Sequence, residues 1–394
     1  MTDFSPPSQP RPGPDTAGIS THAKPVDALG VLRGRMLVQV NPRRVGSHVE
    51  HVYTSRSGLV LSGKKTSEKV AELRKGGYSG VLLADPARYL TGAAQEDEPF
   101  LPPDNQTSTF SVLEDELATQ LARGADAVMS PTGYIDAEDS GSLKAAAKTI
   151  IEFNDPRMIF TVPISVAWLQ DSEVPQVIAV LKLVPGIKAI MLGGQMDPLK
   201  AKKSVANLCR VLSEVPNTAL MRTDIAAFGA LAHGAIFSSF GMGSSQRHIV
   251  PPFEITNSSK FGGKTPSVLY PDLMGFFLGE TIARRFAAHA DAPSCSCATC
   301  GGKPLDRFTD KSSEKEAIAH NISVMMGWAA ELEAAAVRTD PRYWWRDRCA
   351  TAIDRHLEIN TRIKQPKAFE VSAQLDQWSG IPAAAGSPLG AEEI

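Results

Sequence analysis

Short apolar runs alternate with amphipathic stretches along most of the chain. The later runs recur about every 30 residues and are apolar throughout, which is typical of strands buried on both faces of a parallel sheet. Strands are expected at 36–40, 58–62, 79–85, 125–130, 158–168, 187–194, 218–223 and 235–241. Helices are expected at 66–77, about 110–123, 142–153, 174–184, 198–215 and 224–234. Eight strands with helical crossovers favour a closed α/β barrel, the (β/α)8 or TIM barrel, over an open doubly wound sheet.

The two ends of the chain differ from this pattern. Residues 1–28 are rich in Pro, Gly, Ser and Thr, which predicts a disordered leader, and they lack the apolar core of a signal peptide. The barrel is expected over 29–290, followed by a metal-binding subdomain with C-terminal helices over 291–375. The polar residues 376–394 predict a flexible tail. The expected C-terminal helices are at 313–336 and 343–362.

Charge and composition exclude several classes of function. Lys plus Arg number 41 and Asp plus Glu 43, so a protein that coats nucleic acid through a general basic field is disfavoured. The sequence has no run of 18 apolar residues, which argues against a membrane-spanning helix. Neither GxGxxG nor GxxxxGK[ST] follows a predicted strand, so dinucleotide and P-loop sites have little support.

Three of the five cysteines lie in the segment CSCATC, as Cys295, Cys297 and Cys300. Clustered thiols in a chain expected to be cytoplasmic indicate a metal, and the glycines that follow permit the tight turn that convergence needs. His320, on a predicted helix 20 residues after Cys300, is the best fourth ligand. Zn²⁺ suits three sulfurs and one nitrogen, and four protein ligands make a structural site. The alternatives are ordinary loop residues, a redox disulfide and a core histidine.

At these residues the chain resembles the tRNA-guanine transglycosylase superfamily. CSCATC matches its CxCxxC motif, and His320 with the two residues after it is similar to the family's histidine-asparagine-leucine step. GIKAIMLGGQMDP resembles the strand whose terminal Gly-Gly, here Gly193 and Gly194, meets the base through its backbone. VLLAD, ending at Asp85, resembles the strand that ends in the first catalytic aspartate. The resemblance spans about 80 to 330.

The resemblance implies a pentosyltransferase that exchanges guanine in a nucleic acid for a 7-deazaguanine. A carboxylate attacks the anomeric carbon to give a covalent intermediate, a second carboxylate manages protons, and the nucleotide is turned out of its stack. Asp85 takes the position of the first carboxylate, at the C-terminal end of a strand and so at the active face of a barrel. Its alternative role is to cap the turn before Pro86.

The chain departs from the family where the nucleophile is expected. The last strand of the tRNA enzymes ends in an aspartate and a cysteine, whereas this chain has Ser238 and Ser239. DPARYL also replaces the expected turn after the first aspartate, and SPTGY replaces the acidic residue that reads guanine. Asp224, which follows the penultimate strand, is a candidate substitute nucleophile, or else an N-cap of the next helix. Ser238 is a candidate for holding a phosphate or a base.

Other polar residues follow the predicted strands. Gln195 is a candidate for bonding a purine edge and Arg222 for binding phosphate or a carboxylate, each against a surface or salt-bridge role. His248, in a polar loop after the last strand, is a candidate phosphate contact or is simply solvated. PRYWWRDR interleaves aromatic residues with arginines, either to clamp a nucleic acid or as the buried foot of a helix with its arginines reaching solvent.

Three functions therefore stay open. Loss of the family's loop motifs favours the divergent branch that places 7-deazaguanines in DNA, while tRNA remains an alternative substrate. The third is a non-catalytic partner that keeps the fold and the zinc but has lost the nucleophile. By resemblance, a homodimer that pairs around the zinc subdomain is expected, or an association with other proteins of a modification system.

Overall fold

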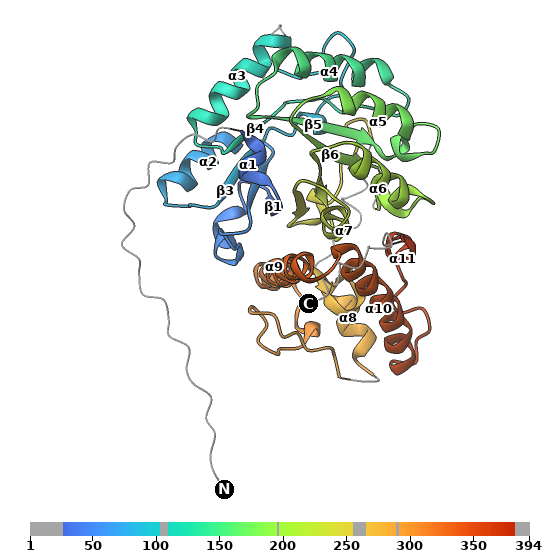
Figure 1. The fold of residues 1–394 in the computed structure, drawn as a ribbon. Coiled ribbons are helices and arrows are strands. Elements are labelled where there is room, and N and C mark those ends of the chain that lie inside the picture. The colour runs from blue at the N-terminus through green and yellow to red at the C-terminus, as the bar shows by residue number, and fades with distance from the viewer. Residues whose placement is uncertain (1–26, 103–108, 195–196, 255–264, 289–290, 383–394) are drawn as a thin grey trace, which may run out of the picture.

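The computed structural model describes residues 27–102, 109–194, 197–254, 265–288 and 291–382, and contains the predicted barrel (Figure 1). All eight strands of the barrel are parallel and each pairs with the next in sequence. β8 closes the barrel against β1, with Met36 beside Ser238. The strands are β1 (Met36–Val40), β2 (Gly58–Ser62), β3 (Val81–Asp85), β4 (Ala127–Met129), β5 (Met158–Ser165), β6 (Ile187–Gly193), β7 (Thr218–Thr223) and β8 (Ser238–Gly241). The chain thus folds as a (β/α)8 barrel, which confirms the prediction.

The predicted crossover helices surround the strands. One of them is shorter than expected, because Pro198–Lys200 forms a separate 3-10 turn whose start is capped by Asp197, and the helix proper begins at Ser204. The helices are α2 (Thr66–Lys75), α3 (Thr109–Ala122), α4 (Ser140–Phe153), α5 (Val174–Leu183), α6 (Ser204–Glu214) and α7 (Ala226–Ala232). A short α1 (Ala28–Leu32) packs its buried residues into the apolar cluster that fills the barrel.

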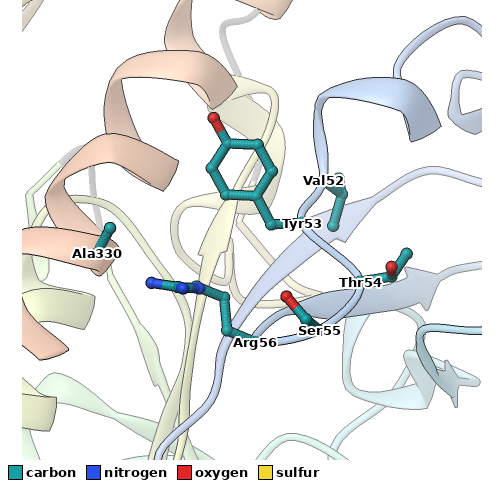
Figure 2. A pocket seen from close by; sticks show the side chains of 6 residues that line it. All are labelled: Val52, Tyr53, Thr54, Ser55, Arg56 and Ala330. Carbon is teal, nitrogen blue, oxygen red and sulfur yellow. The ribbon is translucent and has the colours of Figure 1, made fainter. Parts of the chain in front are cut away.

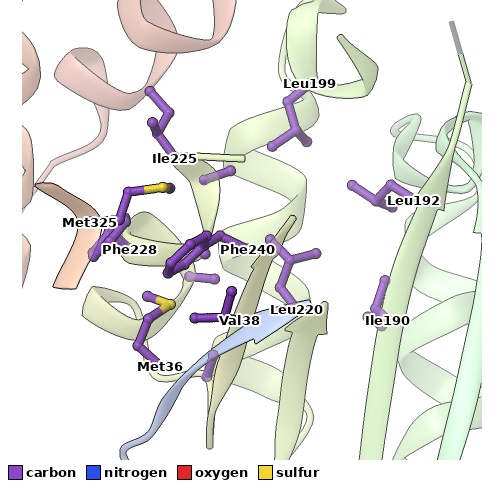
Figure 3. Packing of buried hydrophobic residues seen from close by; sticks show 14 of the residues in the cluster. Met36, Val38, Ile190, Leu192, Leu199, Leu220, Ile225, Phe228, Phe240 and Met325 are labelled. Atoms are coloured by element: carbon purple, nitrogen blue, oxygen red, sulfur yellow. The ribbon is translucent and has the colours of Figure 1, made fainter. Parts of the chain in front are cut away.

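Alternation along each strand separates an inner from an outer apolar layer. Residues such as Leu37, Leu83 and Met191 belong to the cluster inside the barrel. Their neighbours face the helices: Figure 3 shows Phe240 packed beside Phe228 of α7 on the outer side of the strands. A shift of one position in strand register would therefore move a side chain from the layer under the helices to the inside of the barrel, or the reverse.

The later part of the chain packs on the outside of the barrel, against α7 (Figure 1). It contains a hairpin of β9 (Ser267–Tyr270) and β10 (Gly275–Leu278), then α8 (Gly279–Phe286), α9 (Glu314–Arg338) and α10 (Pro341–Arg362). The two long helices match the predicted stretches, whereas the hairpin was not predicted. Trp345 of α10 is fully buried, with its ring 6.1 Å from that of Phe228.

The flexible tail predicted from residue 376 is wrong for its first part. Ala373–Gly380 forms α11, capped by the Ser372 side chain, and Leu375 and Trp378 are buried. Trp378 packs edge-on against Trp345 with ring centroids 6.0 Å apart. The two apolar residues are three positions apart, on one helix face, but a single pair is too short a pattern to predict a helix. Residues 383–394, and the predicted leader up to residue 26, lie outside the described residues.

The arginines of PRYWWRDR have acidic neighbours. Arg342 bonds Asp340 at 2.5 Å, Arg346 bonds Asp347 at 2.8 Å, and Arg348 pairs with Glu331. This favours the helix-foot interpretation over a nucleic-acid clamp. Across the part of the chain that the structure describes, no helix combines the length and apolar character needed to cross a bilayer.

Candidate functional site

Cys295, Cys297, Cys300 and His320 converge as the sequence predicts. Their ligand atoms all lie within 4.8 Å of one another. The three sulfurs lie 3.6, 3.5 and 3.1 Å from Nδ1 of His320. Bonds of about 2.3 Å to sulfur and about 2.0 Å to nitrogen in a tetrahedral site place these atoms about 3.5 Å apart. The four residues therefore fit a tetrahedral metal ion.

Local backbone geometry and the partner of the histidine build this centre. Gly301 and Gly302 have φ values of 55° and 90°, which other residues adopt only with strain, and they turn the chain so that Gly302 N bonds Cys295 O at 2.9 Å. His320 lies on the buried side of α9, where its Nε2 is 2.7 Å from Leu269 O. The carbonyl requires a proton on Nε2, which leaves Nδ1 free to bind a metal.

Two neighbouring side chains complete the surroundings of the centre. Arg307 Nη2 is 3.0 Å from Cys300 Sγ, where its charge offsets the net negative charge of three thiolates around a divalent ion. Asn321 Oδ1 accepts from Leu269 N at 2.7 Å, and its amide donates to Ser267 O at 2.9 Å. The centre thus ties the β9–β10 hairpin to α9. Four protein ligands would leave a bound ion no open position, which is the arrangement of structural sites.

Asp85 lies inside the barrel at the end of β3 and is 1% exposed. Its carboxylate accepts four hydrogen bonds: from Gln39 Nε2 at 3.1 Å, Ser62 Oγ at 2.7 Å, Tyr89 OH at 2.5 Å and Ala87 N at 2.8 Å. Burial raises the pKa of Asp85, and the hydrogen bonds from Tyr89, Ser62 and the Ala87 backbone, together with the charge of Arg222, oppose that shift. Gln39, Ser62, Asp85 and Tyr89 are called the Asp85 network below.

Arg222 lies over the Asp85 network. Its Nη1 is 3.1 Å from Ser62 Oγ and 3.5 Å from Tyr89 OH. Its other donors bond the loop that follows β8, with Nε at 3.0 Å from His248 O and Nη2 at 2.6 Å from Ser245 O. The backbone of Arg222 has a φ of 52°, which is strained for this residue type and turns its side chain across the mouth of the barrel.

The two serines of β8 face opposite sides of the barrel wall. Ser238 points outward and its Oγ donates to Leu220 O at 2.5 Å, so it does not face the mouth as a substrate-binding residue would. Ser239 points inward, where its Oγ accepts from Arg222 N at 3.1 Å and bonds Gln39 Oε1 at 3.1 Å. Ser239, rather than the predicted Ser238, thus contacts the Asp85 network.

Other residues of the chain pack against Gly193 and Gly194, where the resemblance places a base. A Cβ on Gly193 would overlap the ring of Tyr134, so the glycine makes room for that tyrosine. Gly194 N donates to Ile249 O at 3.0 Å, and Ile249 N to Leu192 O at 3.0 Å. The backbone expected to meet a base is therefore paired with the loop after β8. Gln195 lies outside the described residues.

Asp224 faces a cleft beside the mouth, lined by Leu192, Asp197, Pro198, Leu199, Arg222, Thr223, Asp224, Arg247 and Gln374. Asp224 precedes Ile225, the N-cap of α7; its Oδ1 accepts from Ala226 N at 3.0 Å, and its Oδ2 accepts from Gln374 Nε2 at 2.7 Å. Asp85 is not among the lining residues, whereas Arg222 belongs both to the cleft and to the contacts of the Asp85 network. The two predicted catalytic aspartates thus occupy separate surroundings joined by one arginine.

Asp197, which the sequence analysis did not select, supplies a second carboxylate to this cleft. Its Oδ1 accepts from Leu199 N at 3.2 Å. Burial and the neighbouring charge of Asp224 raise the pKa of Asp197 to about 6. The sequence signal for Asp197 was an acidic residue shortly after a Gly-Gly that ends a strand. The cleft that Asp197 and Asp224 line is called the Asp197–Asp224 cleft below.

Two basic residues of the loop after β8 border the same region. Arg247 stacks on Phe276, with its guanidinium carbon 3.3 Å from the ring centroid, and Nη1 is 3.3 Å from Ser267 Oγ. Burial lowers the pKa of Arg247 to about 10, and the charge of Asp224 opposes that shift. Burial also lowers the pKa of His248, and the adjacent Arg222 adds to the effect. His248 is therefore less suited to hold a phosphate as a cation.

A larger hollow lies elsewhere on the surface (Figure 2). It has a volume of about 480 Å³ and lies between the segment 52–56 and Ala330 of α9. Its one charged lining residue, Arg56, bonds Glu333 at 2.6 Å. None of the sequence-predicted site residues lines it, so the barrel mouth and the Asp197–Asp224 cleft remain the candidate site.

Comparison with known proteins finds distant structural similarity only. No protein-family model matches the chain, and no curated protein matches its sequence. One similar solved structure is the carboxyl transferase domain of Rhizobium etli pyruvate carboxylase, with 12% identity, a TM-score of 0.31 and coverage of 55% of this chain and 42% of that one. Dihydrodipicolinate synthases from Aquifex aeolicus and Oceanobacillus iheyensis each have 11% identity and a TM-score of 0.32. They are covered over 69% and 70% of their lengths, against 53% and 55% of this chain.

Proposed function

We propose that this chain exchanges guanine for a 7-deazaguanine in a nucleic acid, with DNA the favoured substrate and tRNA the alternative. The observation that carries the proposal is the combination, in one chain, of a CxCxxC–His centre with carboxylates at the mouth of a (β/α)8 barrel. The centre fits Zn²⁺ through its three sulfurs and one nitrogen, and zinc there holds the late helices in place.

In the proposed reaction, Asp224 is the nucleophile. Its half-buried carboxylate faces the cleft, whereas the carboxylate of Asp85 is enclosed by four donors. An oxygen of Asp224 forms a bond to the anomeric carbon as the bond to guanine breaks, and the electron pair of that bond leaves with guanine. Asp197 donates the proton that guanine takes up, and it recovers a proton from the incoming base as that base displaces Asp224.

Asp85 is a positioning residue in this scheme. It holds Ser62 and Tyr89, which in turn contact the guanidinium of Arg222. Carboxylates accept from the N–H groups of guanine, and an arginine donates to its O6 and N7. The cleft brings both residue types together, and Arg222 exchanges a bond to the loop after β8 for one to guanine once the nucleotide has been turned out of its stack.

The test is exchange of radiolabelled guanine into duplex DNA and into tRNA by the purified full chain. We expect incorporation into one of them, and a loss of at least 100-fold in the Asp224→Asn and Asp197→Asn variants. Asp171→Asn is the control, because Asp171 is a surface residue paired with Lys203. Undiminished exchange in Asp224→Asn would refute the assigned nucleophile.

A non-catalytic role is the second candidate, and the closed mouth favours it. Ile249 pairs with Gly194 and Leu192, and Arg222 is bonded to two loop carbonyls, so the protein fills the space that a base would take. In this case neither nucleic acid takes up label, yet the chain binds one of them, or a partner protein, in a sedimentation experiment.

A further inference from the structure

The loop after β8, residues 242–249, closes the barrel mouth through hydrogen bonds to two barrel elements. Ile249 N donates to Leu192 O at 3.0 Å, and Gly194 N donates to Ile249 O at 3.0 Å, so the loop pairs with the end of β6. From β7, Arg222 reaches two other carbonyls of the loop with its Nε and Nη2, at 3.0 and 2.6 Å. A nucleotide can therefore enter the mouth only when these bonds open.

Arg247 ties this loop to the β9–β10 hairpin outside the barrel. Its guanidinium carbon lies 3.3 Å from the ring centroid of Phe276, and its Nη1 is 3.3 Å from Ser267 Oγ. At the end of β8, its Nε is 3.3 Å from Gly241 O. A half-buried guanidinium stacked on an aromatic face is a strong contact for a single side chain. The hairpin thus holds one side of the loop.

The same hairpin is held from its other side by the candidate metal centre. Ser267 O accepts from Nδ2 of Asn321 at 2.9 Å. Leu269, the register partner of Phe276, bonds Nε2 of His320 through its carbonyl at 2.7 Å. A hairpin of two four-residue strands is marginally stable by itself, so its shape depends on these contacts with α9. With a metal at Nδ1 of His320, Nε2 keeps its proton and its bond to the hairpin.

We propose that Arg247 couples this centre to the barrel mouth. An occupied centre fixes the hairpin, the hairpin fixes Arg247, and Arg247 holds the loop after β8 closed. Loss of the metal frees the hairpin, and the loop then opens more often and exposes the Asp85 network. Metal occupancy thereby regulates access of a nucleotide to the mouth. The inference rests on the proposed function only for this last consequence, because the coupling itself is a property of the folded chain.

Hydrogen–deuterium exchange of the full chain, read by mass spectrometry, measures the opening at the amides of Ile249 and Gly194. The chain is compared with one equivalent of Zn²⁺ and after stripping with 1,10-phenanthroline. We expect stripping to raise both exchange rates about tenfold, as loss of one desolvated cation–π contact provides. Arg247→Gln and Phe276→Leu break that contact from its two sides. Each should give the same rise with the metal bound, and stripping should then add less than about twofold.

The matched control is Arg346→Gln. Arg346 also lies over an aromatic ring, that of Tyr343 at 5.0 Å, but both residues belong to α10. It should keep the exchange rates of the wild-type chain in both metal states. Metal content and exchange at Leah269 N should stay unchanged in Arg247→Gln, since the hairpin itself remains folded. If Arg247→Gln does not keep its metal, Phe276→Leu decides the question.

Two results would overturn the inference. In the first, stripping leaves both amides protected, or a variant that keeps its metal exchanges them no faster than the wild-type chain. In the second, stripping speeds exchange as much in Arg247→Gln as in the wild-type chain, because the metal then acts by another route. The labelled-guanine assay separates this from the proposed function. Base exchange without the coupling refutes only the inference, whereas the coupling without base exchange refutes only the proposed function.

Discussion

The candidate metal centre and the Asp85 network are both polar clusters inside one molecule, but they are assembled in opposite ways. Three of the four metal ligands come from a six-residue loop and the fourth from one helix. The Asp85 network instead joins the ends of β1, β2 and β3 to the segment after β3, with Arg222 from β7 above it. The metal ligands are mostly close together in the sequence, whereas the residues of the Asp85 network meet only once the barrel has closed.

This difference has a consequence for stability. Removing a metal ligand should release one late subdomain, because the centre ties α9 to the β9–β10 hairpin and to little else. Removing Asp85 should instead weaken the barrel as a whole, because the donors that it satisfies come from several strands. Disrupting the metal ligands should therefore leave the barrel folded, and disrupting Asp85 should leave the metal ligands in place.

The largest expected effect is that of His320→Ala. Without its fourth ligand the centre should lose its ion, and part of the about 10–16 kcal/mol by which structural zinc binds small domains disappears. We expect a loss of about 5 kcal/mol, which lowers Tm by roughly 6 °C for a chain of this length. The checks are metal content by plasma mass spectrometry and melting by calorimetry. Cys209→Ala removes a thiol outside the cluster and should keep one ion per chain; a metal content unchanged in His320→Ala would contradict the assignment.

Asp85→Ala should have the next largest effect. It leaves the buried donors of Gln39, Ser62 and Tyr89 without their acceptor and removes a negative charge near Arg222, which costs about 3–5 kcal/mol. Urea unfolding measures this cost, and the metal content should stay unchanged. Asp171→Ala breaks an exposed ion pair with Lys203 and one hydrogen bond from Asn207, and should cost only about 1 kcal/mol. Equal costs for the two variants would show that the network does not stabilise the barrel.

The same contrast explains what could be predicted from the sequence. The barrel strands were predictable because strands buried on both faces carry continuous apolar runs, and the metal ligands because their spacing is local. The orientation of Ser238 was not, because one position of register decides whether a strand residue faces the interior. Neither was Gln374, since its part in the cleft depends on α11 packing through Trp378, far along the chain.

The smallest expected effect is a dependence on pH. The pKa of Asp197 is raised to about 6, so between about pH 4 and pH 6 the folded chain binds more protons there than the unfolded chain does. This residue's contribution to stability therefore falls as pH rises through that range. Asp197→Asn should gain about 2 kcal/mol relative to the wild-type chain on going from pH 4 to pH 7, measured by urea unfolding at both values.

Asp155 provides the control of opposite sign. Hydrogen bonds from Arg157 lower the pKa of Asp155, so its contribution is present above its unfolded pKa and is lost as pH falls below it. Asp155→Asn should therefore lose stability relative to the wild-type chain between pH 3 and pH 7. The same slope in both variants would mean that Asp197 does not have the raised pKa on which its role as a proton donor depends.

The most direct measurement is trapping of the covalent intermediate. The purified chain is mixed with DNA or tRNA and denatured, and its peptides are mapped by mass spectrometry. We predict a nucleic acid adduct on Asp224 that forms in the wild-type chain, disappears on addition of excess guanine, and is absent from Asp224→Asn. Labelled exchange without any adduct on Asp224, or an adduct on Asp85, would contradict the proposed reaction.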